Sequence, residues 1–253
     1  MRPIIAAVTL QVLSAAAGPA ASLDALELLQ TVHLQAETHH VQGIEIQDNR
    51  LWVTSVDVRN KKGLLLEFRL PDGKLNRSIE LQDGSRYHPG GISADSTSLW
   101  IPIAEYRPQS TSLIEKRNKS TLALEHRFSV QDHIGCIAVT PDFLVGGNWD
   151  ARHLYVWDHR GKLIRKVPNP SGNAFQDLKF RDRKLVGGGL LADKSGAIDW
   201  LEFPSLMSVR RLTTAKTDRG VVYTHEGMTL LGDKLYLLPE DGPSRLFVFR
   251  MPD

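Results

Sequence analysis

Cysteine is nearly absent from this sequence, since Cys136 is the only one among 253 residues. A lone cysteine can form no disulfide within the chain, and its position far from the N-terminus excludes an N-terminal lipid attachment site. The stability of the fold must therefore come from packing. A chain of this length can bury a sizeable core, either as one large all-β domain or as two ordinary domains.

An excess of charge of one sign is also missing. The chain has 31 Lys and Arg against 29 Asp and Glu, a formal net charge of +2, and no block of five or six like charges. We therefore expect no nucleic-acid partner and no polybasic membrane patch. A G-x-S-x-G nucleophile elbow, a P-loop and a Rossmann glycine motif are absent as well, so nothing supports those catalytic classes.

Long apolar runs are confined to the N-terminus. Met1 and Arg2 precede an apolar run from Pro3 to Ala17, which is followed by the small residues of 18–22. This order is typical of a cleaved signal peptide, and the run is shorter than the roughly 20 residues that span a bilayer. We expect a signal peptide over 1–22, a mature domain over 23–253, a secreted or periplasmic location, and no stable membrane anchor after cleavage. A retained anchor is the weaker alternative.

An internal repeat dominates the rest of the chain. Five segments align without gaps, namely 40–57, 88–105, 133–150, 174–191 and 224–241. The fourth residue of each segment serves as an anchor, and the anchors are Gly43, Gly91, Cys136, Asp177 and Gly227. Their separations of 48, 45, 41 and 50 residues are typical of β-propeller blades. Cys136 takes the place of a small anchor residue, so we interpret it as part of the core and not as a nucleophile.

Each unit predicts a hairpin followed by two further strands, because aromatic and β-branched segments alternate with polar turns. The fifth unit ends without a fourth strand, whereas the segment 26–34 near the N-terminus resembles one. The sequence therefore predicts an all-β, five-bladed β-propeller of four-stranded blades, closed by the N-terminal strand as a single domain. Closure would remove an exposed strand edge. A helix over 24–36 is the competing prediction.

Two rows of the repeat predict a shared site at one face. The first strand of a propeller blade lines the central channel, so residues just before it and just after the second strand emerge together. Three residues before the anchors lie His40, His88, His133, Ala174 and Thr224, with His225 beside the last. Fourteen residues after the anchors lie Asp57, Glu105, Asp150, Leu191 and Asp241, with Glu240 beside the last.

Imidazole nitrogens and carboxylate oxygens suit zinc or another first-row divalent metal, and a metal with an open position can activate water for hydrolysis. His40, His88 and His133 are the predicted metal ligands. The wider set of ligand-binding candidates is His40, Gln42, His88, Glu105, His133, Asn148, Asp150, Gln176, His225, Glu226 and Glu240. Tyr106 and Trp149 are candidates for an aromatic wall, with a buried contact between blades as the alternative.

A structural interpretation competes with this site. Arg59, Arg107 and Arg152 follow three of the carboxylates in an acid-x-Arg pattern, so these charges could pair between blades. Repeated histidines can likewise be hydrogen-bonding struts, because the same packing problem recurs in every blade. Glu226 and Glu240 lack an arginine at that spacing.

The unit HVQGIEIQDNRLWVTS resembles the opening blade of plant-type glutaminyl cyclotransferases, and HEGMTLLGDKLYLL resembles a later one. That resemblance implies a secreted five-bladed propeller. The chain from His40 onward, with HPGGIS, DHIGCIAV, GGNWDAR and NAFQDLKF, is more similar to an uncharacterised secreted propeller family, a domain of unknown function, which implies no activity.

Function is therefore predicted from the candidate site alone. The leading hypothesis is an exported propeller that binds a small polar ligand or a divalent metal in a His- and carboxylate-rich funnel, with hydrolysis as a candidate reaction. The alternative is a non-catalytic scaffold that binds a protein or a glycan, and a glutaminyl-cyclotransferase-like enzyme is the less favoured third. Whether the protein is an enzyme, its substrate, the metal and the oligomeric state stay open.

Overall fold

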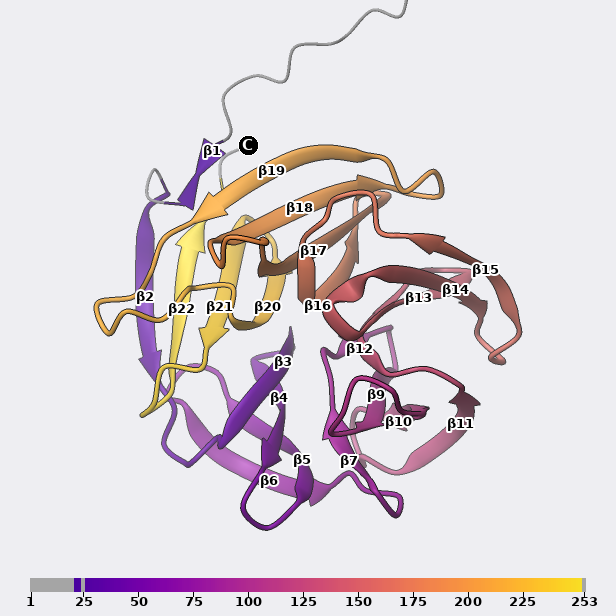
Figure 1. Cartoon of the computed structure of the whole chain (residues 1–253). Helices are drawn as coiled ribbons and strands as arrows, with labels where there is room; N and C mark the ends of the chain where they lie inside the picture. The colour runs from indigo at the N-terminus through magenta and orange to yellow at the C-terminus, as the bar shows by residue number, and fades with distance from the viewer. Residues whose placement is uncertain (1–20, 24–25, 252–253) are drawn as a thin grey trace, which may run out of the picture.

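The computed structural model describes residues 21–23 and 26–251, which form five antiparallel sheets around a central axis (Figure 1). This confirms the predicted five-bladed propeller. Blade one contains β3 (His40–Gln47), β4 (Arg50–Asp57), β5 (Lys62–Arg69) and β6 (Lys74–Glu80). Blade two contains β7 (Arg86–Pro89), β8 (Ser93–Ala94), β9 (Ser98–Glu105), β10 (Ser112–Asn118) and β11 (Leu124–Val130).

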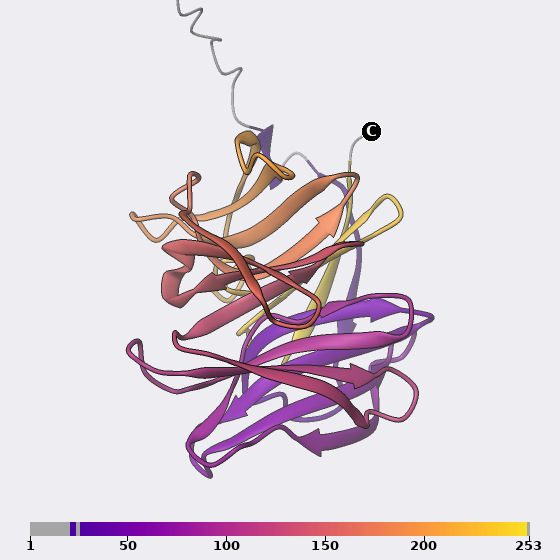
Figure 2. The same ribbon diagram turned by 90° about the vertical axis from the view of Figure 1, so that its right-hand side faces the viewer.

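Blade three contains β12 (Ile134–Val139), β13 (Phe143–Asn148), β14 (His153–Asp158) and β15 (Leu163–Pro168), with the 3₁₀ turn η2 (Trp149–Ala151) after β13. Blade four contains β16 (Ala174–Arg181), β17 (Lys184–Leu190), β18 (Gly196–Glu202) and β19 (Ser208–Thr214). Blade five contains β20 (Glu226–Leu231), β21 (Lys234–Pro239), β22 (Arg245–Arg250) and β2 (Leu28–His33). Figure 2 shows the ring from the side, with blade one in purple at the bottom and blade four in orange at the top.

The N-terminal strand closes the ring as predicted. β2 pairs antiparallel with β22, from Leu28 opposite Phe249 to His33 opposite Arg245. The competing helix over 24–36 is wrong, because exposure alternates with a period of two along most of β2 and its backbone pairs with the edge that β22 would otherwise leave open. The two ends of the chain thus share one blade.

The innermost strand of blade two differs from the prediction because it is interrupted, as β7 and β8, at Gly90 and Gly91. Gly91 turns toward blade three, where its N–H donates to the carbonyl of Gly135 (2.8 Å) and its carbonyl accepts from Ile137 (3.1 Å). A Cβ at position 91 would lie 2.6 Å from the carbonyl oxygen of Gln176 and 2.9 Å from the Cα of Asp177. Only glycine fits this approach to the axis.

The apolar core is divided into five clusters, one between each pair of neighbouring blades. Trp52 of blade one and Ile92 of blade two, for example, are fully buried in the same cluster. Cys136 is also fully buried, and burial raises the pKa of its thiol to about 12. This confirms its place in the core, since a thiol with so high a pKa carries almost no thiolate at neutral pH.

A buried carboxylate ties the blades together at the axis. Asp177 of blade four accepts from the N–H groups of Ile44 in blade one (2.9 Å) and Met228 in blade five (3.1 Å). Its other oxygen accepts from Lys179 (2.6 Å), whose ammonium also donates to the carbonyl of Ile92 in blade two. Two side chains of blade four therefore bond three other blades.

The predicted signal peptide lies largely outside the described residues, since 1–20 are not among them. At its end, β1 (Ala21–Ser22) pairs parallel with Leu212 and Thr213 of β19, and Leu23 is buried between blades four and five. Within the described residues no helix is long and apolar enough to cross a membrane.

Replacing Asp177 by Ala is expected to lower the free energy of unfolding by about 3–5 kcal/mol. The change leaves a buried ammonium unpaired and two buried N–H groups without acceptors. Denaturant unfolding of Asp177→Ala measures this, and Asp142→Ala, at an exposed side chain, serves as the control and should be nearly neutral. Equal midpoints for the two variants would contradict the role of the axial carboxylate.

Candidate functional site

A cavity of about 240 Å³ lies at one mouth of the central axis. Nine of the eleven candidate residues line it, namely His40, Gln42, His88, His133, Asn148, Asp150, Gln176, His225 and Glu226. Tyr106 and Trp149 line it too, so both candidates for an aromatic wall face the same space. We call this cavity the central pocket.

The two remaining candidates lie beside the central pocket. Glu105 lines a neighbouring cavity between blades two and three, and Glu240 contacts His40. Gly135 and Phe175 also line the central pocket. The sequence repeat did not identify them as candidates, because they occupy positions outside the polar rows. No chemical signal in the sequence distinguishes these two from ordinary core residues.

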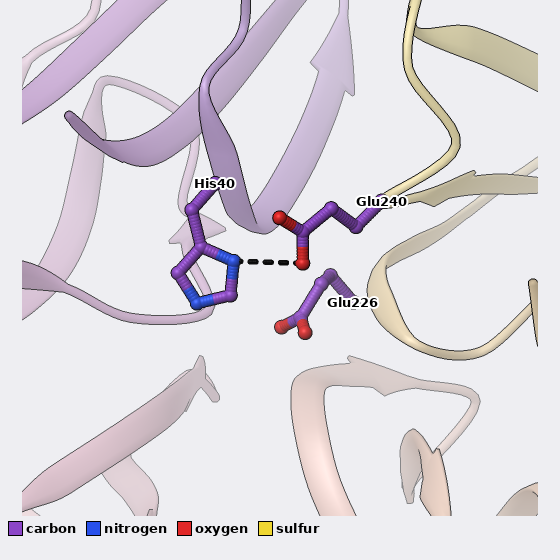
Figure 3. A group of neighbouring side chains, drawn as sticks. All are labelled: His40, Glu226 and Glu240. Atoms are coloured by element: carbon purple, nitrogen blue, oxygen red, sulfur yellow. Dashed lines mark hydrogen bonds and ion pairs between the residues drawn. The ribbon is translucent and has the colours of Figure 1, made fainter. Parts of the chain in front are cut away.

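An imidazole and two carboxylates meet where blade one faces blade five. His40 begins β3, Glu226 begins β20, and Glu240 follows β21. His40 Nδ1 lies 2.9 Å from Glu240 Oε2, and one ligand atom from each of the three residues lies within 4.8 Å of the other two (Figure 3). β20 can approach β3 this closely because position 227 is glycine: a Cβ there would lie 2.8 Å from Ile44 Cγ2.

We call His40, Glu226 and Glu240 the triad, and the pKa values of its three members shift in different directions. The pKa of Glu226 is raised to about 8, chiefly by burial; His40 acts to lower it, and the neighbouring carboxylates of Glu240 and Asp177 add to the rise. The hydrogen bond from His40 lowers the pKa of Glu240. Burial acts to lower the pKa of His40, but the bond to Glu240 and the charges of both glutamates outweigh it and raise that pKa. Glu226 is therefore mostly protonated at neutral pH, and it lies beside the hydrogen-bonded pair of His40 and Glu240 and 3.1 Å from His225 Nε2.

His88 and His133 form an aromatic group with Tyr106 in the same pocket. The ring centroids of His88 and His133 are 5.2 Å apart, and the Tyr106 ring lies 4.7 Å from His88. Burial lowers the pKa of His88 well below its usual value and also lowers that of His133. His133 Nδ1 donates to the carbonyl of Arg107, whereas the buried Nδ1 of His88 has no hydrogen-bond partner. Both imidazoles are neutral near pH 7.

The distances single out different candidate metal ligands from those expected. In the described part of the chain, the group of three or more His, Cys, Asp or Glu side chains that meets the 4.8 Å criterion is His40, Glu226 and Glu240. It shares only His40 with the predicted set. The predicted set of His40, His88 and His133 stays a prediction, with the first two ring centroids 6.5 Å apart.

The predicted salt bridges are found in part. Arg107 pairs with Glu105 at 2.7 Å and Arg152 with Asp150 at 3.0 Å, each within its own loop and not between blades. The prediction is wrong for Asp57, whose carboxylate accepts from the backbone N–H (3.0 Å) and side-chain amide of Asn60. Because Asp57 ends β4, its oxygens are placed to cap the following turn.

Comparison with known proteins supports the fold and leaves the activity open. A model described as a family of unknown function matches residues 25–176, more than half of the chain. Among curated proteins, no sequence matches. The crystal structure of Myxococcus xanthus glutaminyl cyclase is similar, with a TM-score of 0.67 and 11% sequence identity over 90% of this chain and 97% of that one. At that identity the likeness shows the fold alone.

Replacing Glu226 by Gln is expected to stabilise the metal-free protein at pH 8. The pKa of Glu226 is raised from 4.5 to about 8 on folding, so its contribution to stability is greatest below about pH 4.5 and is lost as the pH rises to 8. Glutamine stays neutral, so the variant should gain on the order of 2 kcal/mol at pH 8 and lack this pH dependence.

Denaturant unfolding between pH 5 and pH 8 in the presence of a chelator measures the difference. Glu37→Gln, at a side chain that is 79% exposed, should keep the wild-type pH dependence. Parallel curves for the wild type and Glu226→Gln would show that Glu226 is ionised throughout this range.

Proposed function

Because this protein belongs to the DUF6454 family, a family of unknown function, we propose its function from the site: it binds a divalent first-row cation through His40, Glu226 and Glu240 and holds a small polar ligand in the central pocket. One imidazole and two carboxylates suit cations such as Zn²⁺ or Mn²⁺. The convergence of these three side chains from the two ends of the chain is the observation that carries the proposal.

Burial of Glu226 supports a cation at this place. The side chain is almost fully buried next to a second carboxylate, an arrangement that costs free energy whenever both are ionised. A divalent cation would compensate both negative charges and would replace the proton on Glu226. Without a cation, Glu226 either holds a proton or places a second negative charge beside Glu240.

The position of the arginines also supports a cation. Arg107 and Arg152 lie at the rim, 64% and 70% exposed, where each pairs with an acid of its own loop. No arginine is among the described residues that line the central pocket. An arginine in the pocket would have repelled a cation and favoured an anionic ligand.

A cation held by three protein side chains keeps open positions for water or substrate. In that setting it lowers the pKa of water and polarises a carbonyl or phosphoryl group, so hydrolysis is the reaction class that the site would support. The amides of Gln42, Asn148 and Gln176 lie around the same space and can bond a polar ligand. The ligand is therefore expected to be small and rich in polar groups.

Two alternatives rest on weaker support. A non-catalytic scaffold would use the pocket residues only for packing, which leaves the burial of Glu226 beside Glu240 without a compensating benefit. Cyclisation of glutaminyl substrates, which the name of the Myxococcus xanthus enzyme suggests, rests on fold likeness.

Export is part of the proposal. Cleavage after Ser22 would remove β1 and leave blade four with four strands like the others, while Leu23 would keep its place in the core. The mature protein would then begin at the first buried residue of the propeller. We propose a secreted or periplasmic location on this basis and on the N-terminal pattern.

The mature protein, purified without a His-tag and loaded with Zn²⁺ or Mn²⁺, is expected to hold about one cation per chain. His40→Ala, Glu226→Gln and Glu240→Gln should each weaken binding at least about 100-fold, because loss of a metal ligand costs more than loss of a residue that only hydrogen-bonds a ligand. Elemental analysis after dialysis and isothermal titration measure this.

His88→Ala and His133→Ala are the matched controls. Retention of the metal in both favours the triad of His40, Glu226 and Glu240, whereas loss in both, with the triad variants unaffected, would assign the metal to the imidazoles. A wild-type protein that holds no stoichiometric metal under any loading condition would contradict the proposal.

Expression of the full chain in a bacterium with a secretion pathway is expected to give a mature protein outside the cytoplasm with Leu23 at its N-terminus. N-terminal sequencing and fractionation measure this. Replacing Leu10 and Leu13 by Asp should keep the protein in the cytoplasm at full length, because it breaks the apolar run that the secretion machinery recognises. An uncleaved wild-type chain in the cytoplasm would exclude export.

A further inference from the structure

A second cavity, of about 460 Å³, adjoins the central pocket between blades two and three. We call it the outer groove. It is lined by Glu105, Arg107, Pro108, Gln109, Ser110, Thr111, Gln131, Asp132, Asn148, Trp149 and Arg152. Asn148 and Trp149 line both cavities, so the two spaces adjoin at the end of β13.

Trp149 is held between the two cavities by an unusual turn. Asp150 and Ala151, directly after it, both have positive φ angles, 57° and 47°, which non-glycine residues rarely adopt. The turn is held in place because Ala151 is fully buried in the core between blades three and four. The His133 ring packs edge-on against the indole, with centroids 4.7 Å apart. Strained backbone of this kind concentrates at ligand-binding sites.

The charges of the outer groove cancel. Glu105 pairs with Arg107, Arg152 with Asp150, and Asp132 accepts from Tyr155 and lies 3.7 Å from the Lys166 ammonium. Exposed amide and hydroxyl groups remain around the indole, among them Gln109 and Gln131. The groove therefore offers one flat apolar surface, many hydrogen-bonding groups and no net charge.

We propose that the outer groove and the central pocket together bind a neutral oligosaccharide, whose chain crosses Trp149. A sugar ring combines an apolar face, which packs on an indole, with a rim of hydroxyl groups that need donors and acceptors. A length of several units accounts for two adjoining polar cavities that share Asn148 and Trp149. The placement of the inner end at the cation rests on the proposed function, whereas the contacts of the outer groove do not.

The test is isothermal titration of the metal-loaded protein with oligosaccharides of one to six units, built from glucose, xylose, mannose or N-acetylglucosamine. In at least one series, affinity should rise with chain length. Trp149→Ala should weaken binding of the hexasaccharide about tenfold through loss of the stacking surface. Gln131→Ala should weaken binding of the longer chains and leave the shortest that binds unchanged.

Gln30→Ala, an exposed amide on β2 that lines neither cavity, is the matched control and should bind as the wild type. Gln131 is exposed, so its variant remains informative even if Trp149→Ala fails to fold. Absence of binding in all four series, or unchanged binding by both groove variants, would overturn the proposal. The metal content of each variant is measured in parallel: sugar binding without a cation would refute the metal site alone, and a cation without sugar binding would refute the oligosaccharide alone.

Discussion

The carboxylate of Asp177, buried at the axis, is the interaction on which the rest of the structure depends. It bonds the backbone of Ile44 in blade one and Met228 in blade five, while Lys179 beside it reaches Ile92 in blade two. The apolar clusters lie between neighbouring blades, so the inner strands are joined across the axis by polar contacts such as these and the backbone bonds of Gly91 to blade three. This polar connection therefore fixes the distance between inner strands that share no sheet.

The candidate site is built directly on that connection. His40 lies four residues before Ile44 on β3, and Glu226 lies two residues before Met228 on β20. The same carboxylate oxygen thus sets the spacing of the two strands that supply an imidazole and an acid. Its negative charge also contributes to the high pKa of Glu226. The architecture and the electrostatics of the central pocket therefore share one origin.

Two of the three candidate cation ligands lie outside the repeated rows of the sequence. The recurring histidines of blades two and three become neutral, buried partners of Tyr106 and Trp149. The candidate cation ligands Glu226 and Glu240, both in blade five, lie two positions and one position away from the repeated rows. A side chain that occurs at every blade solves a packing problem common to all blades, whereas a ligand must converge on one point. The repeat therefore placed most candidates at one mouth of the propeller, whereas the ligand atoms that lie within 4.8 Å of one another belong to His40, Glu226 and Glu240. The predicted set of His40, His88 and His133 stays a prediction.

The sequence by itself determined the number of blades, the strands within them and the closure by residues near the N-terminus, because these follow from local strand patterns, a constant spacing and the need to pair every edge. It also placed nine of the eleven candidates at one cavity, since the strand period fixes the face from which they emerge. Only the tertiary structure decided which of them touch. His40 and Glu240 are 200 positions apart and meet because the ring closes. The turn that places Trp149 between two cavities, and the burial that protonates Glu226, likewise arise from packing between blades, which no local pattern encodes.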